Sequence, residues 1–210
     1  MKKLIFATLA MILTLSAFSF QARAARADGN ITPPTLPPGM APVPAGNKLV
    51  LGTHAVGTQN YVCKPSGAGV AYVLFTPQAT LFGEDGGQVI THYNSPNPFE
   101  PNTDPKVVAP EGTIRATWQY RDTSKVWAKV HQPNGAVTVD TKAIAWLLLD
   151  GVGSQNGPTG GDKLTGTTFV QRLNTTGGLA PKTGCSSLTD VGNTAFVPYT
   201  ADYFFYQKAS

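Results

Sequence analysis

The sequence predicts an all-β protein, built as a single antiparallel β-sandwich or flattened β-barrel domain with one disulfide. Glycine and proline account for 22 and 17 of the 210 residues, a composition that favours turns over helices. No helical periodicity persists over a dozen residues, whereas short apolar or alternating runs are separated by turn-forming residues. This succession of short strands is typical of sandwiches and barrels.

The predicted strands begin after a proline-rich stretch and continue almost to the end of the chain. They cover residues 48–53, 59–63, 70–76, 79–82, 88–93, 113–120, 126–132, 136–140, 143–150, 164–174 and 195–207. Segment 143–150 is apolar on both faces, which fits either a central strand or a short buried helix. GEDGG at 83–87 and Pro-Asn-Gly at 133–135 are each predicted to form the turn of a hairpin.

Residues 1–27 have the pattern of an export signal. Two lysines precede an uncharged apolar run at 4–20, which is shorter than the roughly 20 residues of a membrane span, although a retained anchor is the alternative. Two A-x-A sites follow in tandem, and we favour cleavage after the second, which leaves Asp28 at the amino terminus. Residues 28–47 contain six prolines and are expected to form an extended arm that tethers the domain or lies along its surface. Residues 48–210 would form the β domain.

Removal of this signal changes the charge balance of the chain. The full sequence has 16 basic and 12 acidic residues, and cleavage at Ala27 removes Lys2, Lys3, Arg23 and Arg26, so that 12 of each sign remain. Binding to nucleic acid or to an anionic membrane surface requires a basic surface, so neither partner is expected. The expected location is the periplasm or the exterior, with an unknown envelope or extracellular ligand, and the oligomeric state stays open.

Cys63 and Cys185 are the two cysteines of the mature chain. In an oxidising compartment two cysteines most simply pair, so we expect a disulfide that closes a loop of about 122 residues. The sequence contains no CxxC, H-x-x-x-H, G-x-G-x-x-G, Walker-type or G-x-S-x-G motif. The sequence therefore has no motif for zinc binding, for dinucleotide or nucleotide binding, or for the nucleophile of an α/β-hydrolase. We assign no metal, cofactor or catalytic residue.

Six runs carry a resemblance to known sequences. They are PAGNKL at 44–49, HAVGTQNYVC at 54–63, AWLLL at 145–149, VQRLNTTGG at 170–178, APKTGC at 180–185 and VPYTADYFFY at 197–206. Together they resemble a family of secreted bacterial and fungal proteins defined only as a domain of unknown function. The family usually has a Gly-Pro-Thr-Trp-Glu-like run where this chain has SPNPFE at 95–100, and that departure puts a shared pocket there in doubt.

The resemblance implies no established activity. Some fungal members of the family are labelled malate dehydrogenase. Such an enzyme needs a parallel sheet and a glycine loop that cradles phosphate, and this sequence predicts neither. We therefore do not expect dehydrogenase activity.

The histidines are candidates for a catalytic or metal site. His54 and His92 each lie at an end of a predicted strand, so both could reach the same end of a sheet. With a carboxylate such as Asp202 or Glu100 they would form an acid/base or metal site, as in a secreted hydrolase or metal-dependent enzyme. The alternative is that each histidine only bonds a neighbouring loop. His131 is expected to face solvent.

Arg172 lies in a predicted strand that is partly polar. Alternation places Val170, Arg172 and Asn174 on the same face of this strand. An ion pair between Arg172 and Asp202 would connect two strands, and the alternative is that the guanidinium binds the carboxylate of a ligand or a sugar. Tyr199 lies in the same tyrosine-rich segment as Asp202 and is a further candidate.

Trp118 and Trp127 lie on or beside one predicted hairpin. Exposed on a sheet face they could stack on sugar rings, and otherwise they belong to the core. The sequence thus favours an exported binding or structural module, with carbohydrate as a possible ligand class. An enzyme, or an extracellular assembly in which the arm adds a strand to a neighbour, is the alternative. The candidate ligand-binding residues are His54, His92, Trp118, Trp127, Arg172, Tyr199 and Asp202.

Overall fold

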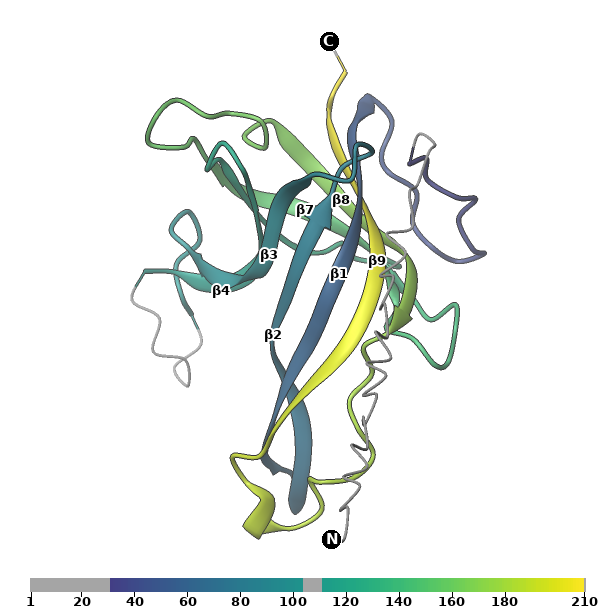
Figure 1. Cartoon of the computed structure of the whole chain (residues 1–210), viewed down its shortest axis with the longest axis vertical. Helices are drawn as coiled ribbons and strands as arrows, with labels where there is room; N and C mark the ends of the chain where they lie inside the picture. Colours follow the sequence, from purple (N-terminus) through teal and green to yellow (C-terminus); the bar gives the residue numbers. More distant parts are fainter. Residues whose placement is uncertain (1–30, 104–110, 210) are drawn as a thin grey trace, which may run out of the picture.

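Strands make up nearly all the regular structure of the chain (Figure 1). The computed structural model describes residues 31–103 and 111–209, so the predicted signal at 1–27 lies outside the described residues. The elements are β1 (Asn47–Ser66), β2 (Gly69–Phe82), β3 (Gln88–Asn97), β4 (Thr113–Tyr120), β5 (Lys125–Val130), β6 (Ala136–Val137), β7 (Trp146–Gln155), β8 (Thr167–Gly177), a 3-10 turn η1 (Leu188–Asp190) and β9 (Thr194–Lys208). The predicted all-β class is confirmed. Within the described ranges, no helix is long and apolar enough to cross a membrane.

Eight of these strands close into an antiparallel barrel. Their order is β5-β4-β3-β2-β1-β9-β8-β7, and a further pairing of β5 with β7 joins the two ends of the sheet. Closure pairs the backbone N–H and C=O groups that an open sheet leaves at its edges. Side chains alternate between the interior and the exterior along each strand. The largest fully buried members of the interior core include Leu81, Ile90, Trp118, Tyr203 and Phe205.

Two of the predicted strand breaks are continuous strand in the structure. Residues 48–63 belong to β1, which passes through Gly57. A Cβ atom there would lie 2.2 Å from the carbonyl oxygen of Gln78, so glycine at this position lets β2 approach closely. β2 likewise continues through Pro77, at a point where it is paired with β1 alone, because its pairing with β3 begins at Ala79. Proline is tolerated at such an edge.

The Pro-Asn-Gly segment at 133–135 does not form the predicted hairpin. β5 and β6 both pair with the same edge of β7, so the chain keeps its direction and the segment bulges outward. The N–H of His131 donates to the carbonyl oxygen of Leu148, whose own N–H donates to the carbonyl of Gly135. Asn134 has a positive φ, which a bulge accommodates as well as a hairpin turn does. The prediction was wrong because the Pro-Asn-Gly sequence does not distinguish the two. The GEDGG loop does join β2 and β3 as predicted.

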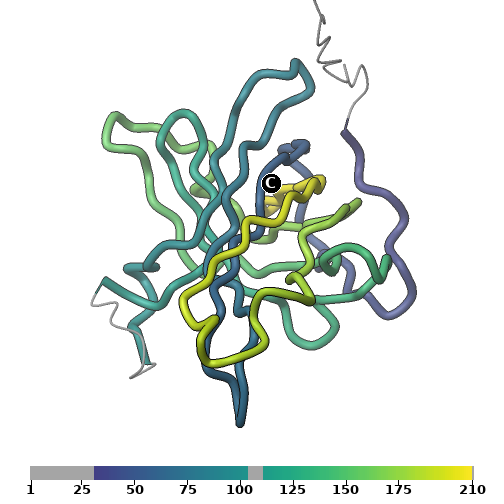
Figure 2. Tube along the Cα trace, turned by 60° about the horizontal axis from the view of Figure 1, so that its bottom comes forward, coloured from purple at the N-terminus to yellow at the C-terminus, as the bar shows by residue number. Residues whose placement is uncertain are grey.

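Residues 31–46, the described part of the proline-rich arm, run along the outside of the barrel (Figure 2). Met40, which is 7% exposed, packs with the outward-facing side chains of Leu148, Leu173 and Phe204. The arm thus covers the outer face of β7, β8 and β9 and gives this part of the sheet a second apolar layer. Of the two positions considered for the arm, the structure shows the one along the surface.

The predicted disulfide between Cys63 and Cys185 is present. The two Cα atoms lie 5.5 Å apart, and the bond ties β1 to the loop between β8 and β9 across 122 positions of sequence. The described residues contain no free cysteine. A structural disulfide of this kind fits a protein that matures in an oxidising compartment.

Replacing both cysteines with alanine is expected to lower the free energy of unfolding by about 2–5 kcal/mol, because the bond restrains a long loop of the unfolded chain. Urea unfolding followed by circular dichroism measures the change. Wild-type protein kept reduced should unfold at the same urea concentration as the double variant. Equal midpoints for the oxidised wild type and the variant would contradict the prediction.

Candidate functional site

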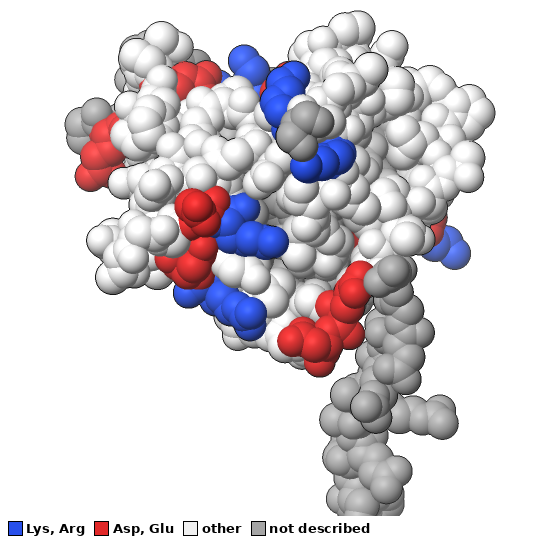
Figure 3. Space-filling view, turned by 90° about the horizontal axis from the view of Figure 1, so that it is seen from above, with Lys and Arg blue, Asp and Glu red and all other residues white. Residues whose placement is uncertain are grey.

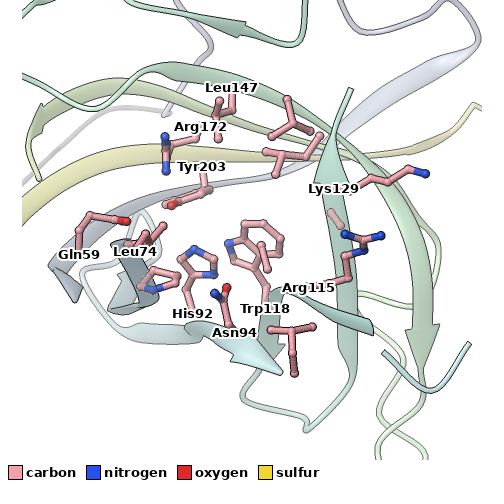
Figure 4. A pocket seen from close by; sticks show the side chains of 16 residues that line it. Gln59, Leu74, His92, Asn94, Arg115, Trp118, Lys129, Leu147, Arg172 and Tyr203 are labelled. Carbon is pink, nitrogen blue, oxygen red and sulfur yellow. The ribbon is translucent and has the colours of Figure 1, made fainter. Parts of the chain in front are cut away.

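A cavity of about 250 Å³ extends into the barrel (Figure 4). Each of the eight barrel strands contributes at least one side chain to its lining. Leu74 and Ile114 line it where the barrel meets solvent and are 46% and 38% exposed, whereas Trp118 and Tyr203 are 1% and 0% exposed. The cavity therefore leads from the surface to the centre of the barrel.

His92, on β3, is a buried neutral histidine in this cavity. Its ring is stacked on that of Trp118, with the centroids 4.3 Å apart. The Nδ1 atom lies 2.8 Å from the carbonyl oxygen of Thr117. Because a carbonyl oxygen can only accept, Nδ1 carries the proton and Nε2 is left as an acceptor. Burial lowers the pKa of His92 to about 3, so the ring is uncharged near neutral pH.

Arg172, on β8, brings a positive charge into the same cavity. Its Nε and Nη2 groups donate to the carbonyl oxygen of Ala145 at 3.2 and 2.8 Å. No described Asp or Glu forms an ion pair with the guanidinium, and the residues that line the cavity include no acid. Burial raises the pKa of the Tyr203 hydroxyl, and the nearby charge of Arg172 opposes that rise. Arg172 is therefore a cation without a counter-ion in the described protein.

Two further side chains that line the cavity have buried N–H donors with no hydrogen bond of good geometry among the described residues, and the Gln59 side chain lies close enough to the Tyr199 hydroxyl to oppose the rise in pKa that burial causes there. The donors are the Nε2 group of Gln59 and the indole Nε1 group of Trp118, and these residues are 2% and 1% exposed. A buried donor without a partner costs about 1–3 kcal/mol. Sequence reasoning missed Gln59. The available signal was the alternation in β1, which puts Gln59 on the same face as Tyr61 and Cys63.

The predicted ion pair between Arg172 and Asp202 is wrong. In the register of β8 and β9, Arg172 is opposite Tyr203, the residue after Asp202. Neighbouring residues of a strand point to opposite faces, so Asp202 lies outside the barrel when Arg172 lies inside. The Asp202 carboxylate instead binds the His54 Nδ1 atom at 2.8 Å and the Asn174 side-chain amide at 2.7 Å.

His54 and His92 do not meet at one end of the sheet. The His54 side chain is 47% exposed outside the barrel, and His92 is enclosed within it. Glu100, the other acid considered, forms a two-bond ion pair with Arg115, which lowers the pKa of Glu100. Across residues 31–103 and 111–209, no group of three or more His, Cys, Asp or Glu side chains could hold a metal ion. The geometry does not assemble the site that the enzyme alternative requires.

Trp118 and Trp127 do not form an exposed aromatic surface. They lie on opposite faces of the β4–β5 pair, since Trp127 is opposite Thr117, and Trp127 is only 3% exposed. Its indole N–H donates to the Ser95 hydroxyl at 2.9 Å, and its ring contacts Phe99 edge-on. The alternative that these tryptophans are buried is the one that the structure shows, and Trp118 reaches a ligand only through the cavity.

The remaining candidates lie outside the cavity lining. Tyr199 is buried beside Tyr203, with 3.4 Å between the two hydroxyl oxygens, and burial raises the pKa of Tyr199. His131, expected to face solvent, is half-buried and binds the Asp150 carboxylate through Nδ1 at 2.7 Å. Figure 3 shows charged side chains of both signs scattered over the face seen from above, with the Lys and Arg side chains in separate small groups. This face offers no broad basic surface.

The fold and the site define a class of protein: a closed antiparallel β-barrel with a cavity of small-ligand size inside it. A family model described as "Protein of unknown function (DUF3455)" matches residues 44–207. The chain belongs to this family, which confirms the resemblance noted from the six sequence runs. No curated protein and no solved structure matched the chain.

The bond to Asp202 raises the pKa of His54 above its ordinary value of 6.5. Protonated His54 is thus favoured in the folded state, so the pair stabilises the fold below about pH 6.5 and loses this contribution as the pH rises through the folded-state pKa. In Asp202→Asn we expect the pKa of His54 to fall. NMR titration of the imidazole protons measures it, and a wild-type value at or below 6.5 would contradict the assignment.

Proposed function

We propose that this chain is an exported binding module that holds one small ligand inside its barrel. The observation that carries the proposal is one cavity lined by an arginine without an acidic partner and by two side chains whose buried donors have no hydrogen bond among the described residues. Folded proteins leave few buried donors unpaired. The interior of an eight-stranded barrel is wide enough for one small ligand. A ligand with hydrogen-bond acceptors would pair with the guanidinium of Arg172, and it would reach the two buried N–H groups once their side chains turn towards it.

The volume of the cavity limits the ligand. About 250 Å³ corresponds to roughly eight water molecules at about 30 Å³ each. It therefore has room for a molecule of roughly ten non-hydrogen atoms, at the small end of known ligand sites. This size favours a small organic molecule over the oligosaccharide that an exposed aromatic surface would have bound.

Export belongs to the same proposal, supported by the pattern of residues 1–27 and by the disulfide. We expect the protein recovered from the periplasm or the medium to begin at Asp28, or at Ala25 if the first cleavage site is used. Mass spectrometry of the intact protein measures this. A chain that keeps Met1 and stays in the cytosol would refute export.

Filling the cavity should weaken binding without harming the fold. Ala128 lines the cavity and is 1% exposed, so Ala128→Leu puts a larger side chain into the ligand volume. Ala136→Leu makes the same change at an exposed position of β6 and serves as the matched control. We expect at least one probe among benzoate, benzamide, benzyl alcohol and benzylamine to bind the wild type and the control. The Ala128 variant should bind that probe about tenfold or more weakly.

Isothermal titration calorimetry gives the affinities, and circular dichroism shows whether each variant folds. If Ala128→Leu does not fold, Ala116→Leu tests the same cavity from β4. Equal affinity of the cavity-filled variant and the wild type would place the ligand elsewhere. Absence of saturable binding for all four probes would refute the proposed function.

A further inference from the structure

We infer that the ligand is a small carboxylate monoanion with a compact apolar body, held with its carboxylate against Arg172. This inference rests on the proposed function, because it names the chemical class of the molecule in the same cavity. It follows from the net charge of the cavity, from the kind of hydrogen-bonding groups within it, and from the distribution of polar and apolar side chains along it.

The charge of the inner cavity favours an anion. Arg172 is cationic, and the neighbouring His92 and Tyr203 are neutral near pH 7. Towards the surface, Arg115 is already paired with Glu100, and Lys129 is exposed. A partly buried charge is costly unless it is paired. One uncompensated cation in the inner cavity calls for one negative charge.

The hydrogen-bonding groups favour a carboxylate. A guanidinium presents a planar fork of N–H donors that matches the two oxygens of a carboxylate. The unpartnered groups of Gln59 and Trp118 are also N–H donors, and an indole N–H can only donate. Figure 4 shows Gln59, His92, Arg172 and Tyr203 on one side of the cavity view, where Leu74 also lies. An anionic group that only accepts is therefore complementary to this end of the cavity.

Apart from Asn94, Arg115 and Lys129, the rest of the lining is apolar, and it determines the chemistry of the part of the ligand beyond the carboxylate. It consists chiefly of Leu74, Ile114, Val130, Leu147 and Leu149. A polyhydroxylated ligand would leave its hydroxyl groups without partners against these side chains, at a cost for each of them. An ammonium ligand would find no acidic side chain in the lining, and a phosphate dianion would carry twice the charge that Arg172 can neutralise.

The test compares benzoate with benzamide, which has nearly the same shape but no charge. We expect wild-type protein to bind benzoate about 10- to 100-fold more tightly than benzamide, the range given by hydrogen bonds to a charged group. Arg172→Met should lose most of this preference. Arg121→Met removes an exposed arginine that lies outside the cavity and should keep the preference. Benzylamine and inorganic phosphate complete the set, and calorimetry measures every affinity.

Different outcomes separate this inference from the proposed function. If benzamide or benzylamine binds as tightly as benzoate, or if phosphate binds more tightly, the carboxylate assignment is wrong while the binding site stands. If Arg121→Met loses the preference as fully as Arg172→Met, the effect comes from overall charge, and the assignment also fails. If no probe binds, the proposed function fails first.

A second variant guards against misfolding of Arg172→Met. Arg172→Lys keeps the positive charge but lacks the planar fork. It should bind benzoate more weakly than the wild type and still more tightly than benzamide. If a folded Arg172→Lys protein binds benzoate as tightly as the wild type does, the planar fork of the guanidinium is not needed for binding. If it binds benzoate and benzamide with equal affinity, the proposed role of the positive charge is wrong.

Discussion

The pairing of β5 with β7 is the constraint on which the rest of this structure depends. It joins the two ends of the sheet, and Val130 lies opposite Leu149 across the seam. Both residues line the cavity, so the seam forms part of its wall. Without this pairing the interior would be open to water, and Gln59, Trp118 and Arg172 could all be solvated. Closure of the barrel is therefore what makes their unsatisfied groups significant.

Histidines on the two faces of the closed sheet have pKa values shifted in opposite directions. His92 lies inside, where burial lowers its pKa, and it contributes a stacked neutral ring. His54 lies outside, where the bond to Asp202 raises its pKa. Protonation therefore acts mainly on the outer surface near neutral pH, while the charge inside the cavity stays that of Arg172. The interior is suited to holding a ligand of fixed charge.

The barrel is apolar on both faces where the arm covers it. Outward-facing Leu148 and Phe204 are fully buried because residues 31–46 lie over them. This explains why segment 143–150 has no polar face in the sequence, although it contributes to a barrel strand and not to a helix. Where the arm leaves β1 and β2 uncovered, for example at residues 53–56, burial alternates more clearly, with exposed side chains on the outside.

Local sequence determined the strand content and the alternation within each strand, because turn residues and period-two patterns depend only on neighbouring residues. It also determined the disulfide, because two cysteines allow only one pairing. Alternation indicated correctly that Val170 and Arg172 share a face, but it was wrong for Asn174, which lies at a break in register and binds Asp202 outside the barrel. Tertiary structure decided which face is inside and which residue is opposite, and the shift of one position between Asp202 and Tyr203 was enough to separate Arg172 from its expected partner. Register and closure arise from contacts between segments far apart in the chain, so the cavity and its unpartnered groups emerge only when the barrel forms.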